Sequence, residues 1–125
     1  MDINLLIILL SWSADLSGYP NPDTLPEIRL EPHSFFVENV CGGKECKAVG
    51  WYNDTGVIYI DERYWNFDGD EESSLLVHEF THHLQYLNGV TDTCFREYQA
   101  YWVQNQYNAI VLTNMRRVRP TCSET

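Results

Sequence analysis

The chain has 125 residues, which is enough for one domain with a buried core. Its 18 acidic and 8 basic residues give a formal net charge of −10, which argues against nucleic acid and anionic membranes as partners. The hydrophobic content of 44% and the aromatic content of 14% are typical of a folded globular protein and exclude an intrinsically disordered chain. We expect a single domain over residues 1–125 and a monomer.

A first helix is predicted over residues 2–17. Apolar side chains recur there at helical spacing from Ile3 onward, and Gly18 is a stop signal. The apolar run of residues 5–10 is too short to span a bilayer. Asp2, with no Lys or Arg beside it, gives the wrong charge for the start of a signal peptide, so no signal peptide is evident. We expect this helix to pack into the core.

The middle of the chain favours a small, mainly antiparallel sheet. The two aromatic residues and the valine at residues 35–37 predict a strand. Two further short strands are predicted at residues 48–52 and 57–61, because β-branched and aromatic side chains fit a pleated surface. Between them, the Asn-Asp-Thr-Gly sequence of residues 53–56 supplies the residue types of a hairpin turn.

The pattern His-Glu-x-x-His lies within residues 73–85, a run without Pro or Gly that predicts a helix. An acidic loop over residues 68–73 precedes it, in which Ser73 or a nearby acid can cap the helix. His78 and His82 are four residues apart and therefore lie on the same face of the helix. They can present two imidazoles to one ion, which suits zinc.

Glu79 lies one position after His78, about 100° round the helix, and so stands beside the ion rather than bonded to it. A carboxylate there can take a proton from a water that the metal activates and pass it to a leaving group. The spacing is a recognised metalloprotease signature. It predicts Glu79 as the general base.

A simpler interpretation is that these histidines are surface residues and that the glutamate is solvated. Against it, apolar residues surround much of the helix and predict a buried helix: Leu75, Leu76, Val77, Phe80, Leu84 and Leu87. Buried His and Glu side chains need partners. Structural zinc sites favour cysteine ligands, whereas sites with two histidines and a carboxylate are typical of hydrolases. The sequence therefore favours a zinc enzyme.

The third zinc ligand is predicted on a long second helix over residues 94–113. Glu97 follows His82 by fifteen residues, and the small Ala100 on the same face would allow a close approach of the two helices. The alternative is that Glu97 is a surface acid. Three other ligands stay open: Asp92, Glu71 and His33. His83 is one position off the ligand face, which favours packing or a supporting hydrogen bond for it.

Three stretches carry a resemblance to a known family. They are Gly-Tyr-Pro-x-Pro at residues 18–22, Leu-Val-His-Glu-x-x-His-His-Leu-Gln at residues 76–85, and Arg-Glu-x-x-Ala-Tyr at residues 96–101. With them the chain resembles the gluzincins, zinc peptidases with the two histidines on one helix and a ligand glutamate on the next. It is similar in particular to small single-domain members of that clan and to a group of uncharacterised bacterial metallopeptidase-like proteins.

The resemblance implies a zincin-like α+β fold. Its parts would be an N-terminal helix, a small mainly antiparallel sheet, and a metal-binding helix packed on a long second helix. It implies that His78, His82 and Glu97 bind Zn²⁺ and that Glu79 is the general base. The strand at residues 57–60 would be the edge strand that aligns an extended peptide.

Two departures from the family pattern concern the surroundings of the metal. Thermolysin-like gluzincins place an Asp four residues after the ligand Glu to orient the first His, and here that position is Tyr101. The residue that stabilises the oxyanion also has no assigned equivalent. The candidates for it are Tyr98, Tyr101 and Tyr107.

The predicted function is zinc-dependent hydrolysis of a peptide or protein substrate, with neither nucleic acid nor membrane as a partner. Two alternatives remain. One is a zinc-binding module with little or no turnover, in which the missing oxyanion group leaves a structural or inhibitory role. The other is a hydrolase of small non-peptide amides.

The four cysteines form no Cys-x-x-Cys pair and predict disulfides, which favour an oxidising, extracytoplasmic location. Cys41 and Cys46 enclose a short loop with two glycines, where a local bridge is feasible. Cys94 and Cys122 remain as the second pair, which would tie the tail to the second helix. The alternative is a free Cys122 whose thiolate binds the zinc and keeps the enzyme latent.

Overall fold

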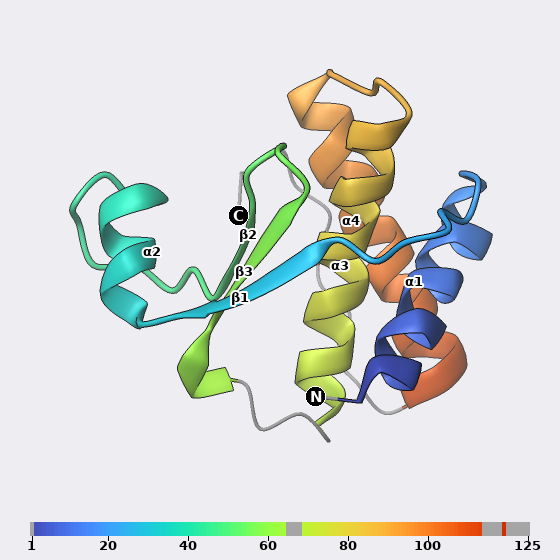
Figure 1. Ribbon diagram of the computed structural model, residues 1–125, viewed down its shortest axis with the longest axis horizontal. Coiled ribbons are helices and arrows are strands. Elements are labelled where there is room, and N and C mark those ends of the chain that lie inside the picture. The colour runs from blue at the N-terminus through green and yellow to red at the C-terminus, as the bar shows by residue number, and fades with distance from the viewer. Residues whose placement is uncertain (1, 65–68, 114–118, 120–125) are drawn as a thin grey trace.

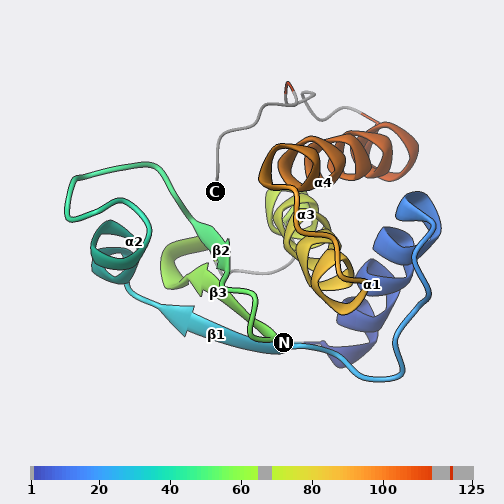
Figure 2. The same ribbon diagram turned by 90° about the horizontal axis from the view of Figure 1, so that it is seen from above.

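In the computed structural model, which describes residues 2–64, 69–113 and 119, three helices pack together beside a small sheet, and a fourth helix lies on the other side of that sheet (Figure 1). The elements in order are α1 (Ile3–Ser17), β1 (Glu27–Glu31), α2 (His33–Asn39), β2 (Gly50–Tyr52), β3 (Val57–Asp61), the 3₁₀ turn η1 (Glu62–Tyr64), α3 (Asp70–Leu87), α4 (Thr93–Tyr107) and the π-helical turn η2 (Asn108–Leu112). The sheet stands between α2 on one side and the helices α1, α3 and α4 on the other (Figure 2). The α+β class is as predicted.

The first helix agrees with the sequence prediction. The Asp2 side chain caps α1 by accepting a hydrogen bond of 2.9 Å from the backbone N–H of Asn4. Gly18 ends the helix in the left-handed region at φ 83°, where its N–H donates to the carbonyl of Ala14. The helix packs into the core along one face, as expected. Within the described part of the chain, no helix has the length and apolarity needed to cross a membrane.

The sheet is mixed, so the prediction of a mainly antiparallel sheet was wrong. Its strand order is β1-β3-β2, with β1 parallel and β2 antiparallel to β3. The predicted strand at residues 57–61 is confirmed, and the one at residues 48–52 is shorter than expected. A parallel pair needs a long crossover connection, and α2 and β2 lie within the one that joins β1 to β3.

The strand predicted around residues 35–37 was also wrong, because these residues belong to α2. Pro32 precedes this helix with φ −66°, and its carbonyl accepts the first helical hydrogen bond from Phe35. A short apolar run fits a strand and a buried helix equally well, so periodicity alone does not decide between them. The strand in this region is instead β1, which follows Pro26 and pairs with β3 in register from Glu27 to Glu31.

The position of β3 corrects one implication of the family resemblance. Because β3 pairs on both sides, it is the central strand and has no free edge for a peptide. The edges of the sheet are β1 and β2. Of these, β2 lies against α3.

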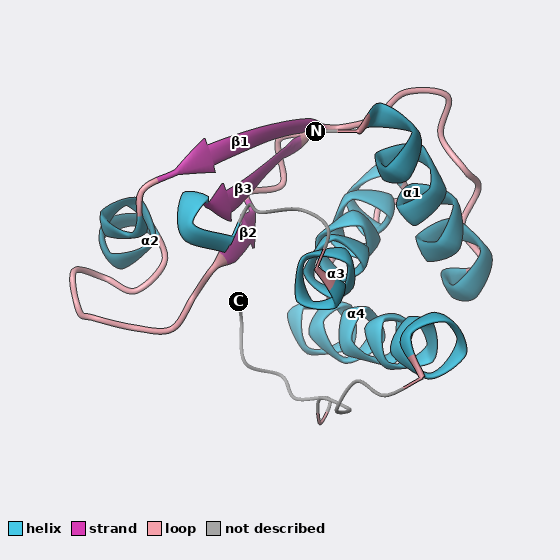
Figure 3. Ribbon diagram, turned by 90° about the horizontal axis from the view of Figure 1, so that it is seen from below, coloured by secondary structure: helices cyan, strands magenta, loops and turns pink. Residues whose placement is uncertain are grey.

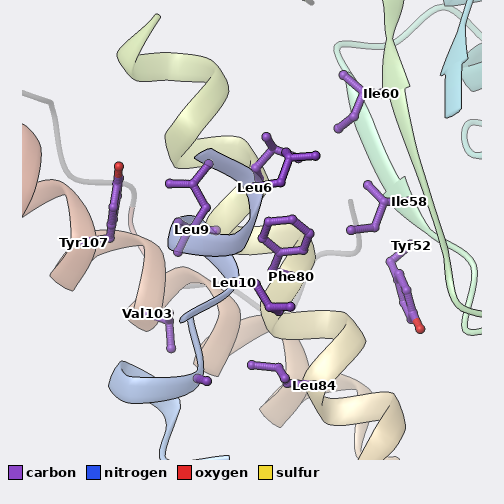
Figure 4. Packing of buried hydrophobic residues seen from close by; sticks show 13 residues of the cluster. Leu6, Leu9, Leu10, Tyr52, Ile58, Ile60, Phe80, Leu84, Val103 and Tyr107 are labelled. Atoms are coloured by element: carbon purple, nitrogen blue, oxygen red, sulfur yellow. The ribbon is translucent and has the colours of Figure 1, made fainter. Parts of the chain in front are cut away.

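The core lies between the sheet and the helices, and α3 is its centre. Phe80 of α3 packs among Leu6 and Leu10 of α1 and faces Ile58 and Ile60 of the sheet (Figure 4). Each such large side chain stabilises the fold by about 1.5–3 kcal/mol when it is fully buried. Seen from below, α3 lies between α1 and α4 and is covered on both sides (Figure 3). This explains why a long run of α3, polar residues included, is buried.

The cysteines agree with the predictions as far as the structure describes them. Cys41 and Cys46 form a disulfide with their Cα atoms 6.3 Å apart. Cys94 is disulfide-bonded as well. The predicted pairing of Cys94 with Cys122 stays a prediction, because Cys122 lies outside the described residues.

The second long helix ends earlier than predicted. α4 stops at Tyr107, and residues 108–112 continue as the π-helical turn η2. The backbone N–H of Thr113 donates to the carbonyl of Asn108 at 2.8 Å, which closes a five-residue turn.

A polar cluster at the start of α2 ties this helix to the sheet. His33 Nδ1 lies 2.8 Å from Oδ2 of Asp61, and His33 Nε2 lies 2.7 Å from Oε1 of Glu45. Arg63 donates two further hydrogen bonds to the same Asp61 carboxylate, which is fully buried. The hydrogen bonds to Glu45 and Asp61 raise the pKa of His33 above 6.5. Burial raises the pKa of Asp61, but the hydrogen bonds from Arg63 and His33 outweigh it and hold the pKa below 3.8.

We expect the contribution of His33 to stability to depend on pH. A histidine whose pKa is raised by folding stabilises the fold fully below its unfolded pKa of about 6.5 and loses this contribution as the pH rises through the folded value. The parent should therefore have a larger free energy of unfolding than His33→Gln, and this difference should be largest near pH 5.5 and smallest near pH 9. Urea unfolding at both pH values measures this difference. An equal difference at both would contradict a charged His33.

Candidate metal centre

The helix α3 carries the His-Glu-x-x-His pattern and starts at Asp70. Gly69 is its N-cap residue and makes no capping bond with a side chain, so Ser73 is not the cap. Three acids lie in the first helical turn, where negative charge is favourable, rather than in a loop as predicted: Asp70, Glu71 and Glu72. The helix ends at Leu87 with Asn88 as its C-cap residue, and Gly89 follows with φ 70°.

Three predicted ligand side chains meet between α3 and α4. His78 Nε2 and His82 Nε2 lie 3.2 Å apart. Glu97 Oε1, from α4, lies 2.7 Å from Nε2 of His82 and 3.7 Å from Nε2 of His78. All three residues are at least 95% buried. The two helices thus bring three donor atoms to one point, as the helical spacing predicted for the histidines.

The other three ligands left open by the sequence lie elsewhere. Asp92 caps α4 by accepting a hydrogen bond of 2.8 Å from the N–H of Phe95. Glu71 is exposed in the first turn of α3. His33 is held in the cluster with Asp61 and Glu45.

Glu79 stands beside the two histidines. Ligand atoms of His78, Glu79 and His82 all lie within 4.8 Å of one another, so this buried group could hold a metal ion. Neither carboxylate oxygen of Glu79 has a hydrogen-bond partner among the described residues. Burial is the main cause that raises the pKa of Glu79 to about 8. A nearby cation would lower this pKa again and restore the ionised base.

A glycine makes room for Glu79. Gly50, the first residue of β2, lies so close that a Cβ there would fall 3.0 Å from Oε2 of Glu79 and 3.0 Å from Cδ1 of Leu75. The edge strand β2 can therefore approach the carboxylate only because residue 50 has no side chain.

Two glutamines contact the histidines, and the sequence prediction named neither as part of the site. Gln104 of α4 places Oε1 3.1 Å from Nδ1 of His78, and Gln85 of α3 places Oε1 2.9 Å from Nδ1 of His82. The spacing could have indicated them, since Gln104 follows Glu97 by two helical turns and Gln85 follows His82 by three residues.

The charges of the three converging side chains are strongly coupled. Burial raises the pKa of Glu97, but hydrogen bonds from His78 and His82 outweigh it and hold the pKa at about 2. Burial lowers the pKa of His78. Burial also acts to lower the pKa of His82, but the hydrogen bond to Glu97 and the charges of Glu79 and Glu97 raise it above 6.5. A proton on Nε2 of His82 therefore faces an ionised Glu97.

This donor set fits a zinc ion. Ligand atoms of a tetrahedral zinc with bonds of about 2.0–2.1 Å lie roughly 3.3 Å apart. The three separations here, 2.7, 3.2 and 3.7 Å, lie around that value. The group also contains the ionised Glu97, the adjacent imidazoles and the Glu79 oxygens, which lack a hydrogen-bond partner in the described part of the chain, and a divalent cation would stabilise it.

A cleft leads to this group. Its volume is about 270 Å³, and it is bounded by the end of α2, by β2 and the turn after it, and by the start of α4. The lining residues are Asn39, Val40, Trp51, Tyr52, Asn53, Asp54, His82, Thr93, Arg96 and Glu97. Two of the predicted metal ligands therefore face a space that a substrate could enter beside the edge strand β2.

None of the three tyrosines predicted to stabilise an oxyanion is among the described residues that line the cleft. Tyr98 is exposed on α4, and Tyr107 packs edge-on against Trp12. The ring of Tyr101 lies over His78, with 4.6 Å between the ring centroids. Among the described residues, the tyrosine that lines the cleft is Tyr52 of β2.

Tyr52 links β2 to α3 through His83. Its hydroxyl lies 2.7 Å from Nδ1 of His83 and accepts a hydrogen bond from the N–H of Gly56. Burial raises the pKa of Tyr52 and lowers the pKa of His83, so this hydrogen bond joins two neutral side chains. His83 thus packs against the sheet, in agreement with its predicted place off the ligand face.

No protein-family model, no curated protein and no solved structure matches the chain.

Replacement of Glu97 tests the third ligand. Glu97→Ala should weaken zinc binding by more than the roughly 10–100-fold that is typical for loss of a supporting residue around a metal site. A competition titration with a chromophoric chelator measures the affinity. The matched control is Glu71→Ala, because Glu71 is exposed on the same pair of helices and Asp92 is needed as a cap. Parent affinity in Glu97→Ala would remove Glu97 from the ligand set.

A side chain at residue 50 should press on Glu79. Overpacking of this kind typically costs about 1–3 kcal/mol, so Gly50→Ala should lower the free energy of unfolding by that amount. Glu79→Ala removes one of the two closest atoms, the other being Cδ1 of Leu75, so the double variant should recover part of the loss. Urea unfolding of the four proteins measures the coupling. Strictly additive losses would show that the Cβ does not meet Glu79.

Proposed function

We propose that the chain is a zinc-dependent peptide hydrolase. The observation that carries the proposal is the meeting of His78, His82 and Glu97 from two helices, with the buried Glu79 beside them and a cleft in front of them. Two histidines and a carboxylate are the ligands of many hydrolytic zinc sites. The resemblance to the gluzincins points the same way.

His78, His82 and Glu97 would hold the ion, and the glutamines behind the histidines would keep both rings in place. A bound zinc ion would polarise the scissile carbonyl group and lower the pKa of a water molecule. Glu79 would take a proton from this water and deliver it to the leaving amine. The absence of a hydrogen-bond partner for Glu79 among the described residues supports this role, because both of its oxygens are available to accept the proton.

The edge strand β2 would align the substrate. An extended peptide can pair with the free edge of a sheet through its backbone, and pockets for alternate side chains then give specificity. β2 lies beside Glu79 and contributes Trp51 and Tyr52 to the cleft. This replaces the strand at residues 57–60, to which the family resemblance had assigned the role. The substrate class remains a peptide or protein, and the predicted extracytoplasmic location accords with the Cys41–Cys46 disulfide.

One observation favours the alternative of a zinc-binding module with little or no turnover. The tyrosine in the cleft, Tyr52, has its hydroxyl engaged by His83 and Gly56. The arginine in the cleft, Arg96, is paired with Asp54. A donor for the oxyanion would have to come from another cleft residue, such as Asn39 or Asn53.

Glu79→Gln separates the two functions. If Glu79 is the general base, the variant should keep its zinc and lose about 10²–10⁴-fold in the rate of peptide cleavage. Digestion of a peptide library by the zinc-loaded parent and variant, with zinc content measured on both, gives the two numbers. A parent that binds zinc without cleaving any peptide supports the binding module. A Gln variant as fast as the parent removes Glu79 from the mechanism.

A further inference from the structure

The amide of Gln85 is fixed from both ends. Its Nε2 donates one hydrogen bond of 2.9 Å to the carbonyl of Arg96 and another of 3.0 Å to Oε1 of Gln99. The Gln99 oxygen also accepts a bond of 2.7 Å from the hydroxyl of Tyr19. Since both amide protons of the fully buried Gln85 are used, its Oε1 must be the atom that faces His82. An oxygen there can only accept, so Nδ1 of His82 carries a proton.

Gln104 presents its amide oxygen to the other histidine. Its Nε2 donates to Oγ of Ser74 at 2.9 Å, and its Oε1 lies 3.1 Å from Nδ1 of His78. With the amide in this orientation, Nδ1 of His78 is the protonated nitrogen of that ring. In both histidines the other nitrogen, Nε2, is left to bind the metal.

Arg96 connects Gln85 with the opposite side of the cleft. Arg96 donates two hydrogen bonds to the carboxylate of Asp54, in the turn between β2 and β3, and its Nε lies 3.5 Å from Oε1 of Gln85. The backbone carbonyl of Arg96 accepts a hydrogen bond from Nε2 of Gln85. Arg96, which precedes the predicted ligand Glu97, thus contacts both polar atoms of the Gln85 amide and is also bound to Asp54 on the opposite wall of the cleft.

We propose that Gln85 and Gln104 are positioning residues that set the tautomers of His82 and His78 for metal binding. The two differ in one chemical respect. The hydroxyl of Ser74 can turn and donate to a carboxylate, so Glu can replace Gln at residue 104. The carbonyl of Arg96 can only accept, so a carboxylate at residue 85 would face it without a proton between them. Residue 85 requires an amide, whereas residue 104 requires only an acceptor.

This inference rests on the metal-binding half of the proposed function and not on turnover. The test is therefore zinc affinity, together with the visible absorption of the cobalt-substituted protein, which reports the geometry of the ligands. Gln85→Leu, Gln85→Glu and Gln104→Leu should each weaken zinc binding about 10–100-fold and change the cobalt spectrum. Gln104→Glu should keep the parent affinity within a few-fold.

The matched control is Gln106→Leu, a half-buried glutamine on α4 that lies about 200° round the helix from Gln104. It should leave the affinity and the spectrum unchanged. Thermal unfolding of the chelator-treated variants separates loss of affinity from loss of stability. If Gln85→Leu does not fold, the imidazole ¹⁵N resonances of the zinc-loaded parent decide, because they report which ring nitrogen is protonated.

Any one of three results would overturn the inference alone. They are the parent affinity in Gln85→Leu, equal losses in Gln104→Glu and Gln104→Leu, and a proton on Nε2 of either histidine in the zinc-loaded parent. A parent that binds no zinc would overturn the proposed function along with it. A parent that binds zinc without cleaving peptides leaves this test intact.

Discussion

The constraint on which the structure depends is the burial of a polar stretch within α3. Helix α3 lies between α1 and α4 and against β2, so polar side chains from His78 to Gln85 are removed from water. A buried polar group without a partner costs about 1–3 kcal/mol, and a buried charge costs more. The neighbouring elements therefore have to supply partners, and α4 supplies Glu97 and Gln104. The packing of α4 on α3 therefore also determines which polar side chains meet at the site.

That arrangement leaves some buried polar atoms without a partner. Among the described residues, these are both carboxylate oxygens of Glu79, one oxygen of Glu97 and the side-chain amide atoms of Asn108. Buried groups of this kind are rare in native proteins and are enriched at functional sites. Around Glu79 and Glu97 the other polar groups are by contrast closely paired, as the bonds of Gln85 illustrate. This contrast marks a place where a metal ion could bind.

The sequence predicted the parts of the fold that depend on local pattern. The helices α1 and α3, the strand β3 and the stop at Gly18 all follow from spacing and from residue types that act within a few positions. The convergence of His78 and His82 followed from helix geometry in the same way. Glu97 could be placed from the family resemblance, and the structure brings its carboxylate to both rings.

What the sequence did not predict depends on contacts between distant segments. The alternation of polar and apolar residues in β1 is typical of a strand and was missed, but its parallel pairing with β3 is set by a distant segment. The helix α2 differs from a strand by burial of Phe36 and by the bonds of His33 to Asp61, neither of which is local. The edge position of β2 follows from the same pairing. The two glutamines were missed because an amide is not itself typical of a metal site, although their helical spacing from Glu97 and His82 was available in the sequence.

The parallel pairing of β1 with β3 has a consequence for the order in which the molecule assembles. The ligands of α3 and α4 are joined by a connection of a few residues, so the loop that brings them together closes at little cost in entropy. β1 and β3 can pair only when the long intervening segment, which contains α2 and β2, brings them together. Non-local pairings of this kind are slow to form. The two helices that carry the candidate metal centre can thus pack early in folding, while the sheet that borders the cleft is completed late.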